Sequence, residues 1–235
     1  MQLPFFYSAE LLNVGEGILS EETSRHVSQV LRMEAGEHLQ LTNGKGVLQT
    51  AEILQAHKKH TSVKILASET GIEKLPKIIL GIAPVKNLSR FEWFLEKVTE
   101  IGITKIIPIK CARSERMQLR YERLQNILIS AMLQSRQRWL PELVELQEIS
   151  EVVKSCDAKN KFIAHCLFSE EKTSLFNEIR NLNGDRIVLI GPEGDFTESE
   201  IDLAINNNFK AVTLGSNRLR TETAGIAACI MLNAS

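Results

Sequence analysis

The first part of the chain alternates short apolar runs with turn residues, which is typical of a small β-rich domain. The pair Asn43-Gly44 between two such runs is a strong hairpin signal. Val27, Val30 and Leu31 recur at helical spacing and predict one helix over residues 23–33. We expect this domain to cover residues 1–70, with residues 71–76 as a linker. Its predicted strands are residues 39–42, 47–54 and 61–66.

From residue 77 onward the pattern changes to continuous apolar strands, each followed by a helical stretch. Strands without alternation are buried on both faces, as in parallel sheets, so residues 77–235 are predicted to form an α/β domain. A long helix is expected from about Glu122 to Trp139, ending before Pro141. The predicted strands are residues 78–82, 106–109 and 187–190, and the first helix has an apolar face made of Phe91, Phe94, Leu95, Val98 and Ile101.

Composition narrows the class of protein. A hydrophobic fraction of 43% suffices for a packed core, and no basic leader or membrane-length apolar stretch is evident, so we expect a cytoplasmic protein without a membrane partner. Cysteines and histidines lack ligand spacing, so no metal is expected. The net charge of −1 conceals a basic segment over residues 86–140, with eleven basic against five acidic residues. Such a segment fits phosphate binding or an ordinary solvated helix face.

The first candidate motif is Gly191-Pro192-Glu193-Gly194-Asp195-Phe196, which follows a buried strand and precedes a helix. Thr197 and Glu200 have capping-box spacing, which places the helix start. Open α/β sheets bind ligands at such loops, and glycines let the backbone approach a flat ligand. The acidic residues disfavour a phosphate and suit a cationic or neutral ligand, such as a sulfonium. The alternative is a tight strand-to-helix connection.

The second candidate motif spans residues 212–225 and again joins a strand, a turn and a helix. Arg220 and Glu222 would be costly to bury unpaired, so they form either a surface ion pair or part of a lined pocket. The small residues Ala224 and Gly225 allow the following helix to pack very closely.

Together these motifs resemble the signature of the RsmE family. Gly191-Pro192-Glu193-Gly194 is followed about twenty residues later by Leu214-Gly215 and Leu219-Arg220-Thr221-Glu222-Thr223-Ala224. Residues 26–32, 96–103, 113–114 and 134–141 match other family blocks in order, so the resemblance spans nearly the whole chain. Two departures are Asp195, where many members have glycine, and Phe5-Phe6-Tyr7, where many have an arginine.

The resemblance implies an S-adenosylmethionine-dependent methyltransferase that acts on N3 of a uridine of 16S ribosomal RNA, in the decoding region of the small ribosomal subunit. It also implies an N-terminal PUA-like β-barrel, a C-terminal SPOUT α/β domain with a deep trefoil knot and a parallel sheet, and a homodimer. Deep knots are so rare that sequence patterns alone would argue against one. The missing phosphate fingerprint excludes a nucleotide-dependent enzyme of the doubly wound class, whereas a non-catalytic RNA-binding or ribosome-assembly protein on the same fold stays open.

Residue type and motif position suggest roles for individual residues. Methylation of uracil N3 needs a base or a cation, because N3 keeps its proton at neutral pH. Arg220 is the first candidate to stabilise negative charge, Glu222 is its partner or the base, and Arg113 is a second cation. The predicted cofactor residues are His165, Ile190, Gly191, Pro192, Glu193, Gly194, Leu214, Gly215 and Leu219, although His165 also fits an ordinary strand-end histidine. The predicted RNA contacts are Arg116, Arg120, Arg123, Gln134, Arg136 and Arg138, each of which also fits a solvated surface.

Overall fold

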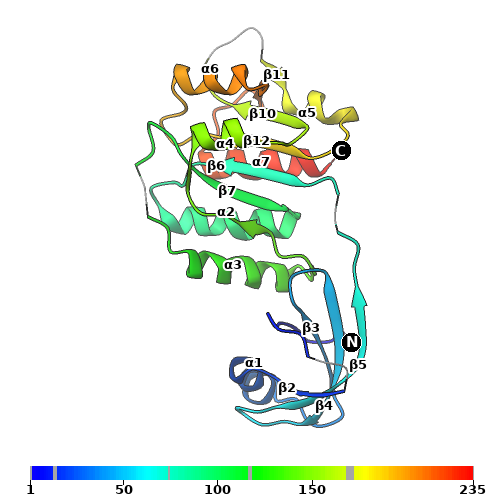
Figure 1. The fold of residues 1–235 in the computed structure, drawn as a ribbon. Coiled ribbons are helices and arrows are strands. Elements are labelled where there is room, and N and C mark those ends of the chain that lie inside the picture. Colours follow the sequence, from blue (N-terminus) through cyan, green and yellow to red (C-terminus); the bar gives the residue numbers. More distant parts are fainter. Residues whose placement is uncertain (1, 13–14, 74, 116–117, 168–171, 235) are drawn as a thin grey trace. The chain divides into compact units, whose positions relative to one another are not determined.

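The computed structural model describes residues 2–12, 15–73, 75–115, 118–167 and 172–234 (Figure 1). Its contacts divide the chain into two units. The first unit contains Met1–Glu73 together with Met132–Leu140, and the second contains Lys74–Ala131 and Pro141–Ser235. The range 77–235 expected for the second domain therefore includes a segment that packs with the first unit.

The first unit is a five-stranded sheet in the order β1-β3-β4-β5-β2. The predicted hairpin is confirmed, since β3 and β4 pair antiparallel and the Asn43 side chain accepts the backbone N–H of Lys45 at 2.9 Å. Val27, Leu39 and Leu41 are completely buried on the inner side of the sheet. The strands are β1 (Phe5–Tyr7), β2 (Glu16–Ile18), β3 (His38–Thr42), β4 (Val47–Gln55) and β5 (Ser62–Thr70).

The helix of this unit differs from the prediction of residues 23–33. Helix α1 (Glu21–Arg25) begins earlier, where the Ser20 side chain accepts the backbone N–H of Thr23, and continues as a π-helical turn, η1 (His26–Val30). The turn ends early because Arg32 has a φ of 53°, which no helix tolerates.

The segment 132–140 contains the second difference. Helix α3 (Tyr121–Gln134) ends five residues before the predicted Trp139. Arg136 has a φ of 56°, and the backbone N–H of Gln137 returns to the carbonyl of Met132. This left-handed turn closes the helix. Arg138, which the predicted helix included, therefore lies beyond the end of α3.

The second unit is built on an eight-stranded sheet in the order β11-β13-β10-β12-β6-β7-β8, with β9 also paired to β7. Every pairing in it is parallel, so the predicted parallel sheet is confirmed. Its strands are β6 (Ile78–Ile82), β7 (Lys105–Lys110), β8 (Glu142–Leu143), β9 (Gln147–Glu148), β10 (Asn160–Ala164), β11 (Thr173–Ser174), β12 (Arg186–Ile190) and β13 (Lys210–Thr213).

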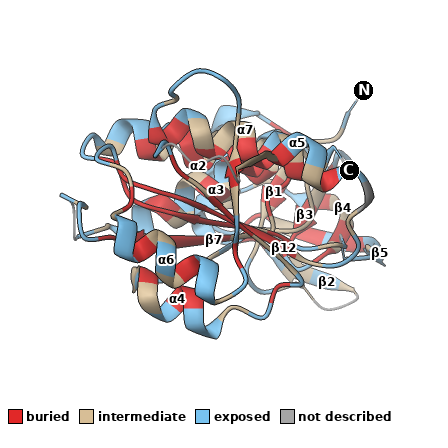
Figure 2. Ribbon diagram, turned by 90° about the horizontal axis from the view of Figure 1, so that it is seen from above, coloured by how far each residue is buried: buried red, intermediate tan, exposed pale blue. Residues whose placement is uncertain are grey.

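Helices cover both faces of this sheet (Figure 2). Helices α4 and α6 pack together on one face, and α2 and α7 pack together on the other. All five residues of β12 are buried, as the apolar run predicted. The bounds are α2 (Leu88–Ile101), α4 (Ile149–Ser155), α5 (Leu175–Glu178), the 3-10 turn η2 (Ile179–Asn181), α6 (Glu198–Asn206) and α7 (Thr221–Asn233).

Helix α7 approaches α2 and β6 very closely, as its small residues predicted. A Cβ atom added to Gly225 would lie 2.5 Å from the Phe94 ring and 2.8 Å from Ile82. The absence of a side chain at this position therefore sets the distance between α7, α2 and the sheet. Among the described residues, no helix combines the length and hydropathy needed to cross a membrane.

This contact leads to a stability prediction. Replacing Gly225 with alanine should lower the free energy of unfolding by about 1–3 kcal/mol, because overpacking outweighs the better helix propensity of alanine. Thermal melting should show a midpoint lower by several degrees. Thr223→Ala, an exposed change on the same helix, is the matched control. A Gly225→Ala protein that melts at or above the wild-type temperature would contradict the close approach.

Candidate functional site

The loop after β12, residues 191–197, lies at the carboxyl end of the sheet, where the sequence placed the first motif. Gly191 and Pro192 are buried, and the Thr221 hydroxyl donates to the carbonyl oxygen of Gly191 at 3.0 Å. A Cβ atom on Gly191 would lie 3.2 Å from the Phe196 ring. The absence of a side chain at Gly191 thus allows the close contact between this loop and the Phe196 ring.

The capping box at the start of α6 is confirmed and has a further function. Glu200 is 8% exposed, and its carboxylate accepts the backbone N–H of Thr197 at 2.8 Å. The same carboxylate accepts the backbone N–H of Ala112 at 2.7 Å. One side chain therefore caps α6 and also holds the loop that follows β7.

Two further carboxylates connect this loop to its neighbours. Asp195 has a φ of 64°, a conformation that favours glycine, and its carboxylate accepts the N–H groups of Phe196 at 2.8 Å and Cys166 at 2.7 Å. These bonds offset the backbone strain that a residue other than glycine has at this φ. Glu193 accepts the N–H of Lys86 at 3.1 Å.

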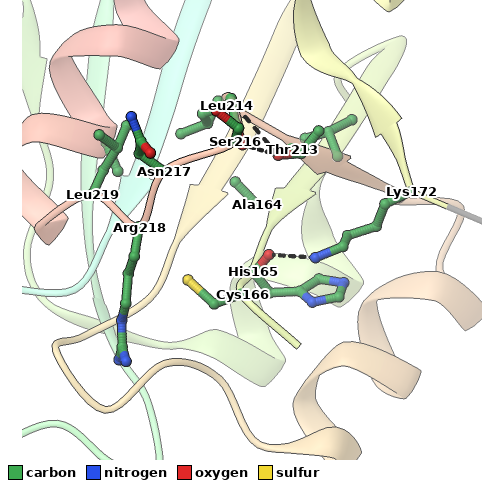
Figure 3. A pocket seen from close by; sticks show the side chains of 13 residues that line it. Ala164, His165, Cys166, Lys172, Thr213, Leu214, Ser216, Asn217, Arg218 and Leu219 are labelled. Atoms are coloured by element: carbon green, nitrogen blue, oxygen red, sulfur yellow. Dashed lines mark hydrogen bonds between the residues drawn. The ribbon is translucent and has the colours of Figure 1, made fainter. Parts of the chain in front are cut away.

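A cavity of about 460 Å³, the first cavity, lies between the ends of β10 and β13 (Figure 3). His165, Leu214, Gly215 and Leu219, all predicted to bind the cofactor, are among its lining residues. The ammonium of Lys172 donates to the His165 carbonyl at 2.9 Å on one side, and Arg218 lies on the other. Burial and then the charge of Lys172 hold the pKa of His165 below its usual value.

A second cavity of about 460 Å³ adjoins the first and shares several of its wall residues. Ile190, Gly191, Pro192 and Glu193 line it together with Arg220 and Glu222, so the structure brings the predicted catalytic pair and part of the predicted cofactor set together. Glu222 pairs with Arg90, whose Nη1 atom lies 3.9 Å from the carboxylate. Three arginines and three carboxylates line this space: Arg90, Arg218 and Arg220, and Glu193, Asp195 and Glu222.

Arg113 and Gly194 lie elsewhere. Neither lines the two cavities described above. The guanidinium of Arg113 donates to the carbonyl oxygens of Gly194 at 2.8 Å and Phe196 at 3.3 Å. Arg113 therefore supports the loop from outside, which makes it a poorer candidate for the second catalytic cation than its place after a strand suggested.

The predicted RNA contacts differ in how free their side chains are. Arg120 and Gln134 are exposed, and Arg123 forms a two-point ion pair with Glu92 that lowers the pKa of that carboxyl. Arg136 donates twice to the Leu3 carbonyl and lies over the Phe5 ring. Arg138 pairs with Glu69 at 3.3 Å, and Arg116 lies outside the described residues.

Sequence reasoning missed several residues of this site. Arg90, Lys172 and Cys166 line the cavities, yet none of them stands in either candidate motif. Arg218 lies inside the second motif, but the sequence suggested no role of its own for it. A signal existed for Arg90, because a cation in the first turn of a helix is unfavourable next to the helix dipole and so suggests a role outside the helix. Cys166 and Lys172 gave no comparable signal.

The fold is that of the RNA methyltransferase class. A family model described as an RNA methyltransferase domain matches residues 73–233, and one described as an RNA methyltransferase PUA domain matches residues 19–66. The Rickettsia conorii protein named ribosomal RNA small subunit methyltransferase E is 30% identical over 213 residues, which are 90% of this chain and 86% of that protein.

Solved structures agree with the family models. The chain is similar to a probable rRNA-methyltransferase from Porphyromonas gingivalis, with a TM-score of 0.90, 36% identity and 99% coverage of both chains. It is also similar to ribosomal RNA small subunit methyltransferase E from Neisseria gonorrhoeae bound to S-adenosyl methionine, with a TM-score of 0.84, 33% identity and coverage of 97% and 95%. The chain belongs to the ribosomal RNA small subunit methyltransferase E family, RsmE.

The pKa of His165 predicts how stability depends on pH. Because the pKa is lowered in the folded protein, the unfolded chain takes up this proton more readily once the pH falls below about 6.5. The neutral imidazole therefore makes its full contribution to the free energy of unfolding above that pH, and this contribution is lost on acidification. Between pH 7.5 and 5.5, wild type should lose more unfolding free energy than His165→Asn, by up to about 1.4 kcal/mol per pH unit. Parallel losses in urea titrations would contradict this assignment.

Proposed function

We propose that this protein transfers the methyl group of S-adenosylmethionine to N3 of a uridine in 16S ribosomal RNA of the small ribosomal subunit, in its decoding region. The observation that carries the proposal is the pair of adjoining cavities at the carboxyl end of the parallel sheet, framed by Gly191 and Gly215. Family membership supports the same activity, since a neighbour with 33% identity is described as bound to S-adenosyl methionine.

The residues present fit this cofactor. The first cavity is large enough for an adenosine group and is walled by Val212, Leu214 and Leu219 together with backbone. Gly215 has a φ of 145°, and a Cβ atom there would meet nothing within 4 Å, so the backbone is open towards the cavity. The carboxylates of Glu193 and Asp195 suit a positively charged sulfonium better than a phosphate. When bound, the cofactor supplies an electrophilic methyl group.

The side chains of the second cavity can prepare uracil for this methyl group. Loss of the N3 proton leaves a negative charge shared between N3 and the two carbonyl oxygens, and the guanidinium of Arg220 can stabilise it. Glu222 can accept the proton: the N3–H bond breaks, an O–H bond forms and the electron pair stays on N3. Because the bonds of N3 to the proton and to the methyl group use the same electron pair, the proton leaves before the methyl group binds.

We also propose a PUA-like RNA-binding domain over residues 1–70, joined by residues 71–76 to a SPOUT domain over residues 77–235, and the match of residues 19–66 to an RNA methyltransferase PUA domain supports the first of these. The basic segment over residues 86–140 supplies further candidate RNA contacts. Arg120 and Gln134 expose their side chains, whereas Arg123, Arg136 and Arg138 would have to exchange existing partners for phosphate. Ribosomal subunits are assembled in the cytoplasm, so we propose that the protein acts there.

A homodimer and a knot complete the proposal. After its polar first turn, helix α7 consists mainly of apolar residues, yet 52% of Ile230 is exposed. On the neighbouring helix α2, 49% of Trp93 is exposed. An apolar helix with an open side favours a second copy of the chain as its cover. The bonds of Thr221 to Gly191 and of Arg218 to Glu193 place the segment before α7 against the loop after β12, which supports a threaded C-terminus. Sedimentation at increasing concentration tests the dimer.

The activity is tested by mapping methylated nucleotides in ribosomal RNA by mass spectrometry. A deletion strain should lack one methyluridine in its 16S RNA and regain it when the gene is restored. If the purified protein binds S-adenosylmethionine and RNA but transfers no methyl group, the alternative of a non-catalytic assembly protein replaces the proposed one.

Gly215 tests the place of the cofactor. Gly215→Ala should weaken binding of S-adenosylmethionine at least tenfold in calorimetry, because the side chain projects into the first cavity from a strained backbone. Gly36→Ala is a matched control, since Gly36 also has a positive φ and open space around it but lies in the first unit. Equal cofactor affinity in both variants would move the pocket elsewhere.

Arg220 tests the proposed chemistry. Arg220→Ala should lower the single-turnover rate by about two orders of magnitude with small changes in cofactor and RNA affinity, since the arginine acts mainly in the transition state. Glu222→Gln separates two roles: loss of a base abolishes turnover, whereas loss of an orienting partner leaves partial activity. A near-normal rate for Arg220→Ala would remove this residue from the mechanism.

A further inference from the structure

Arg90 stands where a helix does not favour a cation. It is the third residue of α2, which Asn87 caps, and the helix dipole presents partial positive charge at that end. About half of its side chain is exposed, so solvent screens its ion pair with Glu222 and the pair contributes little to stability. Neither helix propensity nor surface electrostatics therefore explains an arginine at this position. A role in the adjoining second cavity would explain it.

The carboxylate that Arg90 faces is itself nearly buried. The side chain of Glu222 is 9% exposed, and a buried carboxylate is costly without a cation nearby. The close approach of α7 to α2 at Gly225 and Phe94 lets a residue on one helix reach the other. Arg90, Glu222 and Arg220 line one cavity. The carboxylate pairs with Arg90 on α2, and Arg220 is the N-cap residue of α7, two residues before Glu222.

These three groups differ in their hydrogen-bonding capacity. A guanidinium only donates hydrogen bonds, and an ionised carboxylate only accepts them. The two arginines therefore supply donors, and the glutamate supplies an acceptor. The N3 edge of uracil presents the complement: carbonyl O2 accepts, N3–H donates and carbonyl O4 accepts. Cytosine presents two acceptors and an amino donor along the same edge. Enzymes that modify a base read this edge after flipping the base from its helix.

We propose that Arg90, Glu222 and Arg220 together recognise the N3 edge of the target uracil, with Arg90 as a specificity-determining residue for uracil over cytosine. This rests on the proposed function. Arg90 binds one carbonyl oxygen of the bound base and Glu222 accepts the N3 proton. Arg220 faces the other carbonyl oxygen and stabilises it mainly once negative charge develops there. Cytosine is rejected because its amino group meets a guanidinium and its bare N3 meets a carboxylate. Unpaired or opposed polar groups of this kind give strong discrimination.

The test compares RNA affinity for two bases. Fragments of 16S RNA carrying the mapped uridine, or cytidine in its place, are titrated into protein saturated with S-adenosylhomocysteine. Wild type should prefer uridine at least tenfold, and Arg90→Gln should reduce this preference about tenfold, since one well-formed base contact has that effect. Arg90→Lys should recover only part of it, because the planar fork is lost. A purely structural role would not change the ratio between bases.

Lys97→Gln is the matched control, because it removes one positive charge from the same helix outside the cavity and should leave the ratio unchanged. An Arg90→Gln protein that binds the cofactor normally and keeps the wild-type ratio would overturn the inference while leaving the proposed function intact. If Arg90→Gln does not fold, a wild-type ratio in Arg90→Lys overturns it equally. A wild-type protein that methylates no uridine would overturn the proposed function and this inference with it.

Discussion

Carboxylates of the β12–α6 segment tie the carboxyl ends of three other strands to one loop. Each accepts a backbone N–H from a different neighbouring loop, and such charge-assisted bonds are stronger than neutral ones. The pairs are Glu193 with Lys86 after β6, Glu200 with Ala112 after β7, and Asp195 with Cys166 after β10. Four strand ends are thereby fixed around one loop, so the cavities are formed before any ligand binds, which reduces the entropic cost of binding.

The acidic residues of the second cavity differ in the partners that they bind. The carboxylates next to the glycines accept backbone N–H groups, whereas Arg218 and Arg220 follow β13 and line the same cavity. Glu222 is the exception among the acids, since it pairs with the side chain of Arg90. A carboxylate paired with a half-exposed arginine can exchange that contact for a substrate at low cost.

Much of the fold could be predicted from the sequence because it depends on local signals. The apolar run of β12, the Asn-Gly hairpin and the Thr197–Glu200 capping box each specify their own element. The end of α3 was placed too late, because the left-handed turn at Arg136 is stabilised by a contact with the distant Leu3 carbonyl. Helix periodicity carries no information about such a partner.

The site was predictable where backbone geometry demands glycine and much less so where side chains meet from distant elements. Gly191 and Gly215 stood out in their motifs, and the structure places both beside the cavities. The contact between Arg90 and Glu222 depends on the close packing of two helices. The spacing of residues in the sequence does not reveal this packing. Sequence motifs therefore located the loops around the cavities, but they did not identify the residue that α2 contributes to the second cavity.

The return of residues 132–140 to the first unit limits the modularity of this protein. Trp139 lies against Gly46, whose added Cβ would be 2.3 Å from its ring, and Leu140 bonds to the backbone of Gly44. A fragment ending at residue 73 would lose this packing, although its sheet strands would all be present. Neither unit is a continuous stretch of chain, so recombination between relatives would have to exchange two separated segments together to keep the first unit whole.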